Sequence, residues 1–441
     1  MDENLSDKYF IKSESITNNK SESFNDNINS NSNSETITTS SDENLSQNNN
    51  LDLNGKTLRH YNIIYELGRG SYSIVWLSYN TINKLFYAIK VQNPSDFKEG
   101  LHEIKFVQKL PKNSNLFNNL IEYFIETDND SKYLCSVWNL HCFNIDTLIR
   151  KCGFNNGLLL NNVKYIMKQL IHALYILHKK MHVFHGDIKT DNILIKGINN
   201  RDKFICKKYK ELILESNNQD QEISDPITEK NNLINQKSKN SETCTKTMNF
   251  LNHEKIVNLV YEESEKYSNL DINNKYLDKI NISLADFGTF CEENKTYTGT
   301  FGTRYYQAPE IILLGNCSYP VDIWALGCTF YELLSGEILF NPIKDSKWSR
   351  DYYHLCLIND TCGSFPNNFL KTTKNYNNFF KNNKIIDYEN LNHNRLDTKI
   401  NSLKIANKDK KIIKELLQFM LIIDQKKRCT IDHLYNHIFF D

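Results

Sequence analysis

Residues 185–192 read His-Gly-Asp-Ile-Lys-Thr-Asp-Asn and contain three side chains that could act together on a phosphate group. Asp187 could accept the proton of an attacking hydroxyl group, and Lys189 could neutralise negative charge on a phosphoryl group during transfer. Asn192 could bind a magnesium ion through its amide oxygen. So short a string is a weak signal by itself. The prediction of phosphoryl transfer therefore depends on phosphate-binding and metal-binding residues elsewhere in the chain.

A second candidate metal ligand is Asp286, in the tripeptide Asp-Phe-Gly. The tripeptide follows a strand-like apolar run, residues 280–285, and precedes the sequence Gly-Thr-Arg-Tyr-Tyr-Gln-Ala-Pro-Glu at 302–310. Asp-Phe-Gly alone is common, but its place between a strand and this segment makes it a strong signal. We therefore predict that Asn192 and Asp286 bind magnesium.

A glycine-rich hairpin is expected near the start of the folded part of the chain. Residues 61–67 and 74–79 are strand-like and flank the turn 68–73, whose glycines let backbone amides approach phosphates. A hairpin without a ligand would be about as common, but the order strand-turn-strand argues against a dinucleotide-binding fold. The predicted nucleotide-binding residues of this hairpin are Leu67, Gly68, Arg69, Gly70, Ser71, Ser73 and Val75.

Three further residues complete the predicted nucleotide site. Lys90 lies on a third predicted strand and could pair with nucleotide phosphates; without the hairpin it would be an ordinary exposed lysine. Glu103 lies on the next predicted helix, where it could orient that lysine, although surface glutamates on helices are common. Leu140 lies in the link after two more strands, where the backbone could hold the edge of an adenine ring.

Composition limits the partners and the compartment. The chain has 53 basic and 53 acidic residues, so no net charge draws it to nucleic acid or to an anionic membrane. No apolar run approaches the roughly 18 residues that a membrane-spanning helix needs. The 11 cysteines form no Cys-x-x-Cys pair, which favours free thiols in a reducing compartment. We expect an intracellular protein of the cytoplasm, with the nucleus as a second location, and no membrane or direct nucleic-acid partner.

The pattern of elements predicts two lobes. Residues 1–54 are polar and poor in aromatic residues, so a disordered tail is expected. Residues 61–138 should form a small lobe of five strands and one main helix, and residues 142–441 a larger, mainly helical lobe. Within the larger lobe, the polar insert 197–281 is predicted to be a tether that adds little stability, apart from an amphipathic piece near Tyr209.

These motifs occur together in one order, and on them the chain from residue 61 to 441 resembles a eukaryotic-type protein kinase. The resemblance includes Asp322 of a predicted core helix, expected to brace the catalytic loop, and Arg428, expected to pair with Glu310. Within that family the chain is most similar to the SR-protein kinases. The shared features are the Gly-x-Gly-x-x-Ser loop, Gly186 in place of the arginine of His-Arg-Asp, and the insert before Asp-Phe-Gly. Gln307 is a departure, because that group usually has arginine there.

The resemblance implies an α+β bilobal protein-kinase fold, ATP and Mg²⁺ as cofactors, and transfer of the γ-phosphate to Ser and Thr hydroxyls of protein substrates. Arg/Ser-rich substrates are one option, and a monomer is expected. The alternative is a catalytically silent kinase fold used as a scaffold, although every residue expected to touch ATP or metal is of the right type. A small-molecule phosphotransferase is disfavoured by residues 286–310, which resemble a protein-substrate platform.

Gly186 also predicts the mode of regulation. It cannot supply the guanidinium that, in many kinases, pairs with a phosphate on the activation segment and orders that segment. Activity should therefore not require phosphorylation of this segment. The hydroxyl groups available there are those of Thr296, Tyr297, Thr298 and Thr300.

The substrate groove is predicted to attract basic peptides weakly. Three carboxylates, Asp345, Asp351 and Asp360, lie in or beside the helix that would line it, but basic residues interleave with them. An exposed ion pair contributes only about 0 to 1 kcal/mol, so several carboxylates would have to act together. We predict a weaker preference for Arg-Ser peptides than in the SR-protein kinases, with Asp360 as the best single anchor.

Overall fold

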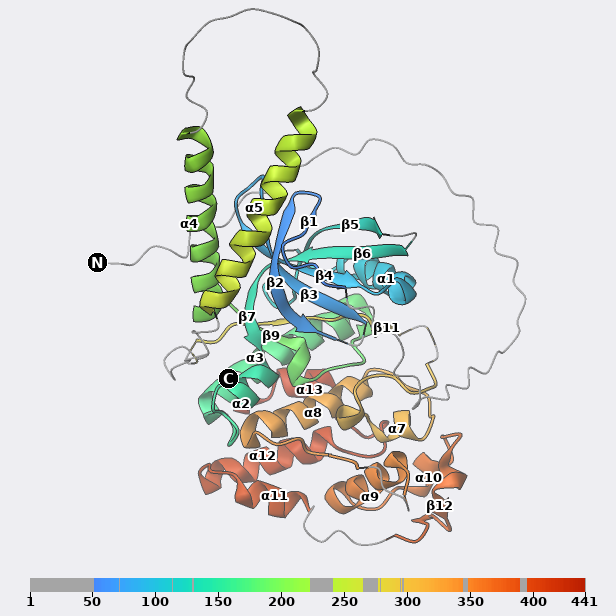
Figure 1. Ribbon diagram of the computed structural model, residues 1–441. Coiled ribbons are helices and arrows are strands. Elements are labelled where there is room, and N and C mark those ends of the chain that lie inside the picture. Colours follow the sequence, from blue (N-terminus) through green and yellow to red (C-terminus); the bar gives the residue numbers. More distant parts are fainter. Residues whose placement is uncertain are drawn as a thin grey trace, which may run out of the picture. The chain divides into compact units, whose positions relative to one another are not determined.

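The computed structural model describes residues 51–70, 72–112, 114–128, 131–222, 241–264, 277, 279–293, 295, 297–343, 348–388 and 395–440 (Figure 1). The predicted tail lies outside these residues except for its last four, of which Leu53 is buried. Ser71, Thr296 and Asp345 also lie outside the described residues. No helix of the described part of the chain is both long and apolar enough to cross a membrane. Within the same ranges the cysteines are thiols, most of them buried.

The small lobe is an antiparallel sheet with the strand order β1-β2-β3-β4-β6-β5 and one main helix, α1 (Phe97–Val107). Strands β2 to β6 confirm the five that were predicted. The two-residue strand β1 was missed, because Thr57 and Leu58 are too few to show a period. The strands are β1 (Thr57–Leu58), β2 (Tyr61–Arg69), β3 (Ser73–Asn80), β4 (Phe86–Gln92), β5 (Leu120–Asp128) and β6 (Ser131–Trp138).

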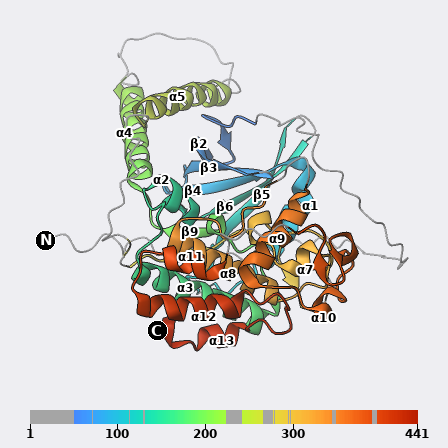
Figure 2. The same cartoon turned by 90° about the horizontal axis from the view of Figure 1, so that it is seen from below.

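The core of the larger lobe is built on α8 (Pro320–Ser335), which is buried from Val321 to Leu334. Helix α3 packs on α8 and α13, and α8 packs on α12 (Figure 2). An apolar stripe on α3 and a nearly continuous apolar sequence in α8 account for these positions. The other helices of the lobe are α2 (Ile145–Lys151), α3 (Leu160–Tyr175), α7 (Pro309–Ile312), α9 (Arg350–Cys362), α10 (Asn367–Leu370), α11 (Leu396–Ser402), α12 (Asn407–Met420) and α13 (Ile431–Tyr435).

Two short sheets position the loops of the candidate site. Strand β9 (Ile193–Lys196) lies between β7 (His141–Asn144) and β10 (Ile282–Leu284), so the segments ending in Asn192 and preceding Asp286 are neighbours. Strand β8 (Val183–Phe184) pairs with β11 (Cys291–Glu292) on the other side of the loop. Helix α3 continues as a π-helical turn (Ile176–Met181), and the left-handed residue His182 then turns the chain into β8.

The described part of the insert contains two long helices, α4 (Asn200–Glu222) and α5 (Ser241–Ser264), which lie against each other (Figure 1). Their buried residues form one apolar cluster with the outer face of β2 and β3 in the small lobe. Tyr209 is fully buried there, which confirms the expected packing of its amphipathic piece. The cluster consists of Ile64, Leu77 and Tyr79 of the sheet and Ile205, Cys206, Tyr209, Ile256, Val257 and Val260 of the insert.

The tether prediction is wrong for residues 253–264. Ile256, Val257 and Val260 are buried, but their small apolar group stands among polar residues and was hidden by the polar composition of the whole insert. Only the tertiary contact with β2 makes this face of α5 a core face.

Deleting residues 218–278 is expected to lower the free energy of unfolding by about 4 kcal/mol or more, since each buried aliphatic side chain contributes about 1.5–3 kcal/mol. The measurement is equilibrium unfolding in urea. A deletion of residues 223–240 that is bridged by a short Gly/Ser linker, so that both described helices and their contact remain, is the control and should change stability by about 1 kcal/mol or less. Equal effects of the two deletions would mean that α5 contributes nothing to the small lobe.

Candidate active site

A cavity of about 540 Å³ lies between the strands of the small lobe and the loops of the larger lobe. It brings together residues that are far apart in the sequence. Its lining includes all the described residues predicted to bind nucleotide or metal, namely Leu67, Gly68, Arg69, Gly70, Ser73, Val75, Lys90, Glu103, Leu140, Asn192 and Asp286. Ser71, the remaining predicted residue of the hairpin, lies outside the described residues.

The glycine-rich hairpin covers one side of this cavity. Gly70 donates a backbone hydrogen bond of 2.9 Å to the carbonyl oxygen of Ser73, which closes the turn between β2 and β3. A Cβ atom at Gly68 would meet no atom within 4 Å, so packing does not explain the glycine there. Open space beside a glycine fits a backbone that a phosphate can approach closely. Arg69 forms a 2.6 Å ion pair with Glu66.

Lys90 is held by two carboxylates. Its Nζ lies 2.9 Å from Glu103 Oε2 of α1 and 3.4 Å from Asp286 Oδ1. Burial alone would lower the pKa of Lys90, but the negative charges of Glu103 and Asp286 raise it above the ordinary value. Glu103 Oε1 also accepts a hydrogen bond of 3.2 Å from the backbone N–H of Phe287. The lysine therefore carries a fixed positive charge at the cavity wall.

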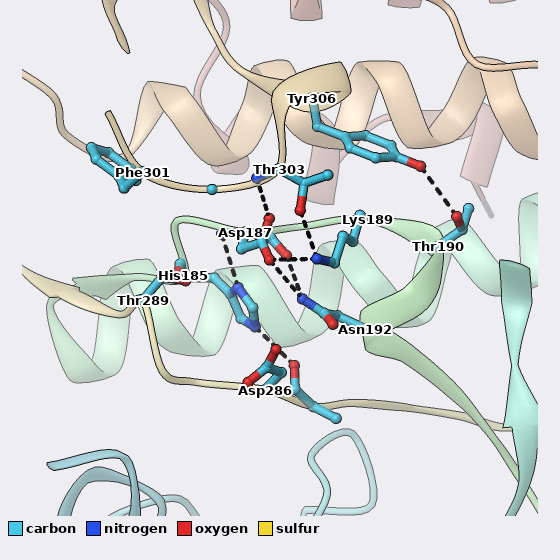
Figure 3. Close-up of polar contacts among 12 residues, drawn as sticks. His185, Asp187, Lys189, Thr190, Asn192, Asp286, Thr289, Phe301, Thr303 and Tyr306 are labelled. Carbon is cyan, nitrogen blue, oxygen red and sulfur yellow. Dashed lines mark hydrogen bonds and ion pairs between the residues drawn. The ribbon is translucent and has the colours of Figure 1, made fainter. Parts of the chain in front are cut away.

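Residues 185–192, the predicted catalytic loop, form a compact polar cluster around Asp187 (Figure 3). Lys189 Nζ lies 2.8 Å from Asp187 Oδ2 and donates a 2.6 Å hydrogen bond to Thr303 Oγ1. The backbone N–H of Thr303 donates a 2.7 Å hydrogen bond to Asp187 Oδ1. Asn192 Nδ2 donates to the backbone oxygen of Asp187 at 2.8 Å, which leaves the amide oxygen as the atom that can bind a cation. Asp187 is thus fixed from three sides.

Asp322 of α8 supports the backbone of this loop from below. Its carboxylate accepts hydrogen bonds from the N–H groups of His185 (2.7 Å) and Gly186 (2.9 Å), and His178 Nε2 lies 2.8 Å away. Burial would raise the pKa of Asp322, but the hydrogen bonds that its carboxylate receives, first of all from His178, lower it. His185 Nε2 lies 3.1 Å from the carbonyl oxygen of Ala285, which links the loop to the residue before Asp286.

Asp286 has a backbone conformation that is rare outside glycine, with φ of 63°. Such strain is typical of residues that a functional site holds in place. Partial burial in the cleft would raise the pKa of Asp286, but the positive charge of Lys90, with that of Lys189, holds it below the ordinary value. An ionised carboxylate and the Asn192 amide oxygen at one cavity are hard oxygen ligands, which suit Mg²⁺.

Several residues that hold the loop were not predicted from the sequence. Thr303 contacts both Asp187 and Lys189, and His178 contacts Asp322. Tyr306 was missed as well: its hydroxyl donates a 2.5 Å hydrogen bond to Glu332 and lies 3.2 Å from Thr190 Oγ1. The sequence 302–310 pointed to the segment of Thr303 and Tyr306, but a pattern along the chain does not reveal such contacts.

The expected ion pair between Glu310 and Arg428 is present and fully buried. Arg428 donates two hydrogen bonds to the carboxylate, at 2.7 and 3.0 Å. A bidentate pair fixes orientation as well as distance. It therefore fastens the end of the 302–310 segment to the larger lobe.

Comparison with known proteins agrees with this geometry. The protein kinase domain model matches residues 61–207 and 211–440. The chain is 27% identical to the serine/threonine-protein kinase SRPK of Physarum polycephalum, over 70% of this chain and 68% of that protein. It is 25% identical to the protein kinase dsk1 of Schizosaccharomyces pombe, over 73% and 69%. The dual specificity protein kinase lkh1 of the same yeast is 24% identical, over 88% and 48%.

The predicted resemblance to the protein kinases, and within them to the SR-protein kinases, is confirmed by these relatives. The two-lobed α+β structure, the cavity between the lobes and the match over most of the chain lead to one conclusion. The chain belongs to the protein kinase family.

Proposed function

We propose that this protein transfers the γ-phosphate of ATP to serine and threonine hydroxyl groups of protein substrates, with Mg²⁺. The observation that carries the proposal is the convergence of Lys90, Asn192 and Asp286 on one cavity, next to the fixed carboxylate of Asp187. Relatives with the name serine/threonine-protein kinase support the choice of hydroxyl groups. A silent scaffold is less well supported, because the ion pair of Lys90 with Glu103 is formed.

Each residue has a role that follows from its contacts. Asp187, held by the Thr303 amide, orients the substrate hydroxyl and accepts its proton. Lys189, next to that carboxylate, neutralises negative charge on the phosphoryl group during transfer. Lys90, a residue of the small lobe, binds phosphate oxygens of ATP. Asn192 and Asp286 would hold Mg²⁺, which supplies positive charge against the phosphates when bound. Placement and charge neutralisation are sufficient for this reaction class.

The proposal is tested with γ-labelled ATP and a panel of basic proteins, followed by identification of the labelled amino acid. We expect magnesium-dependent label on serine and threonine, and none after chelation of magnesium. Label mainly on tyrosine would contradict the choice of hydroxyl group. Failure of every protein in the panel to accept label, with nucleotide bound, would favour the scaffold.

The structure around α9 supports only a weak preference for arginine-rich substrates. Asp351 already forms an ion pair with Arg304 of the 302–310 segment, so its charge is largely neutralised. Asp360 accepts a hydrogen bond from Tyr388 and lines a second cavity, of about 550 Å³, together with Arg395 and Lys427. Basic residues beside the carboxylates reduce the attraction for a guanidinium.

We expect an Arg-Ser repeat peptide to be used about threefold to fivefold better than its Lys-Ser or Ala-Ser counterpart, measured as kcat/KM. Asp360→Ala should remove this advantage, whereas the matched variant Tyr388→Phe, which removes only the hydrogen bond from Tyr388 to Asp360, should keep or enlarge it. An advantage that Asp360→Ala leaves untouched would exclude Asp360 as the anchor. No advantage in the wild type would exclude the substrate class.

A further inference from the structure

The start of the insert forms part of the wall of the nucleotide cavity. Arg201 and Asp202, in the first turn of α4, line the cavity together with Tyr65 of β2. The guanidinium carbon of Arg201 lies 5.5 Å from the centre of the Tyr65 ring. These residues are absent from the set that sequence analysis predicted, because the insert gives no phosphate-binding or metal-binding motif.

A chain of hydrogen bonds runs from the small lobe through this turn to β7, the strand that follows Leu140. Tyr65 donates a 2.5 Å hydrogen bond to Asp202 Oδ1, and Asn199 Nδ2 donates to Asp202 Oδ2 at 2.6 Å. The same Nδ2 lies 2.7 Å from the carbonyl oxygen of Cys142 in β7. Asn199 also caps α4, because its Oδ1 accepts a 2.7 Å hydrogen bond from the Asp202 N–H.

The carboxylate at the middle of this chain is firmly held. Asp202 is 2% exposed, so a lost partner would leave a buried charge without a hydrogen bond. Burial raises the pKa of Asp202, while the hydrogen bonds from Tyr65 and Asn199 favour its charged form.

Helix α4 is also fixed to the small lobe at a second place. The Tyr209 hydroxyl accepts a 3.1 Å hydrogen bond from Asn62 of β2 and lies 3.0 Å from His253 Nδ1 of α5. His253 Nε2 lies 3.2 Å from the carbonyl oxygen of Ile63. This second contact lies at the apolar cluster that α4 and α5 form with β2 and β3, and Tyr209 is not among the residues that line the cavity.

We propose that Tyr65, Asp202 and Asn199 form a strap across the mouth of the nucleotide cavity, and that the strap must open before ADP leaves. The strap joins β2, which carries the glycine-rich turn of the small lobe, to β7, which follows Leu140 in the chain. It therefore resists separation of the two lobes. Opening of lobes or lids commonly limits product release in enzymes of this kind. This inference rests on the proposed function, because it takes the cavity as the ATP site.

The test is the rate of release of a fluorescent mant-ADP in a stopped-flow experiment. Tyr65→Phe keeps the ring and removes only the hydroxyl, and it is expected to speed release about tenfold, since the hydroxyl bonds a charged acceptor. Asp202→Asn keeps an acceptor without the charge and should give a smaller increase. The matched control is Tyr209→Phe, which removes hydrogen bonds of α4 to β2 and α5 at a place away from the cavity. This variant should release mant-ADP at the wild-type rate.

The outcomes separate the strap from the proposed function. Release at the wild-type rate from Tyr65→Phe would overturn the strap, and so would an equal increase in Tyr209→Phe, which would indicate general loosening. Melting temperatures of the variants show whether each is folded, and a merely structural role of Tyr65 would lower that temperature without changing release. If wild-type protein bound no mant-ADP, the proposed function itself would fail, and the strap with it.

Discussion

Asp286→Asn is expected to lower the turnover of protein phosphorylation about a thousandfold, because one electrostatic stabiliser in an active site contributes about a hundredfold to a thousandfold or more. Asparagine has the same shape, so the fold should remain intact, but the negative charge that would hold Mg²⁺ is lost. The contact of Lys90 with Asp286 is also weakened, while its 2.9 Å contact with Glu103 remains.

The measurement is kcat for label transfer to a basic protein, with melting temperature as a check on folding. Asp432→Asn is the matched control. It removes a surface carboxylate that pairs with Lys179, far along the chain from the cavity residues, and should keep the wild-type rate. Equal rates for Asp286→Asn and wild type would point to a contaminating kinase, or to a site in which Asp286 binds no metal.

Gly186→Ala is expected to lower the rate about a hundredfold, because it pushes the catalytic loop, residues 185–192, away from Thr289 of the segment 286–310. Gly186 has φ of 81°, and a Cβ atom there would lie 2.7 Å from the carbonyl oxygen of Thr289. Gly302, with φ of 70°, approaches Gly186 from the other side, and its Cβ would lie 2.5 Å from the Gly186 oxygen. A shift of about 1 Å next to Asp187 can cost about a hundredfold in rate.

The matched control for Gly186→Ala is Gly153→Ala. Gly153 has a similar φ of 85°, but a Cβ atom there would meet nothing within 4 Å. It therefore reproduces the backbone strain, about 1–2 kcal/mol, without the collision. A comparable loss of rate in both variants would show that strain alone, and not contact with the activation segment, sets the effect.

Two hydrogen bonds that join residues 286–310 to the catalytic loop are the reason why we expect phosphorylation of this segment to be unnecessary. The Thr289 hydroxyl donates a 3.1 Å hydrogen bond to the carbonyl oxygen of His185, and Thr303 donates to Asp187, so protein atoms do the work that a phosphate–arginine pair does elsewhere. Phosphatase-treated wild type should therefore retain most of its rate. A large loss that rephosphorylation of this segment restored would contradict the role given to Gly186.

The candidate site could be read from the sequence because each part of it is a local motif. Lys90, Glu103 and Asp286 each stand on an element with a clear period or in a short recognisable string, and the fold then brings both carboxylates within 3.4 Å of Lys90 Nζ. Motif order supplied the long-range information that periodicity lacks. Strand β1 could not be predicted, since its two residues, Thr57 and Leu58, show no period. The packing of α5 could not be predicted either, since a mostly polar helix shows no clear core face in its sequence.

Contacts between distant segments of the chain could not be predicted from the sequence either. The sequence contains no pattern that predicts the hydrogen bond between Tyr65 and Asp202 or the ion pair between Arg304 and Asp351. Both pairs join residues that are far apart in the sequence and that only the folded structure brings together. The second pair bears on the proposed substrate preference, because Asp351 already pairs with Arg304 and is one of the carboxylates predicted to attract a basic peptide.

The most direct test compares Asp187→Asn with wild type in two measurements on the same preparations. One is equilibrium binding of a fluorescent ATP analogue, and the other is the rate of label transfer from ATP to a protein substrate. A general base contributes about a hundredfold to ten-thousandfold, so we predict unchanged nucleotide binding with transfer about a thousandfold slower. Transfer by Asp187→Asn at the wild-type rate, with nucleotide bound equally well, would contradict phosphoryl transfer at this site.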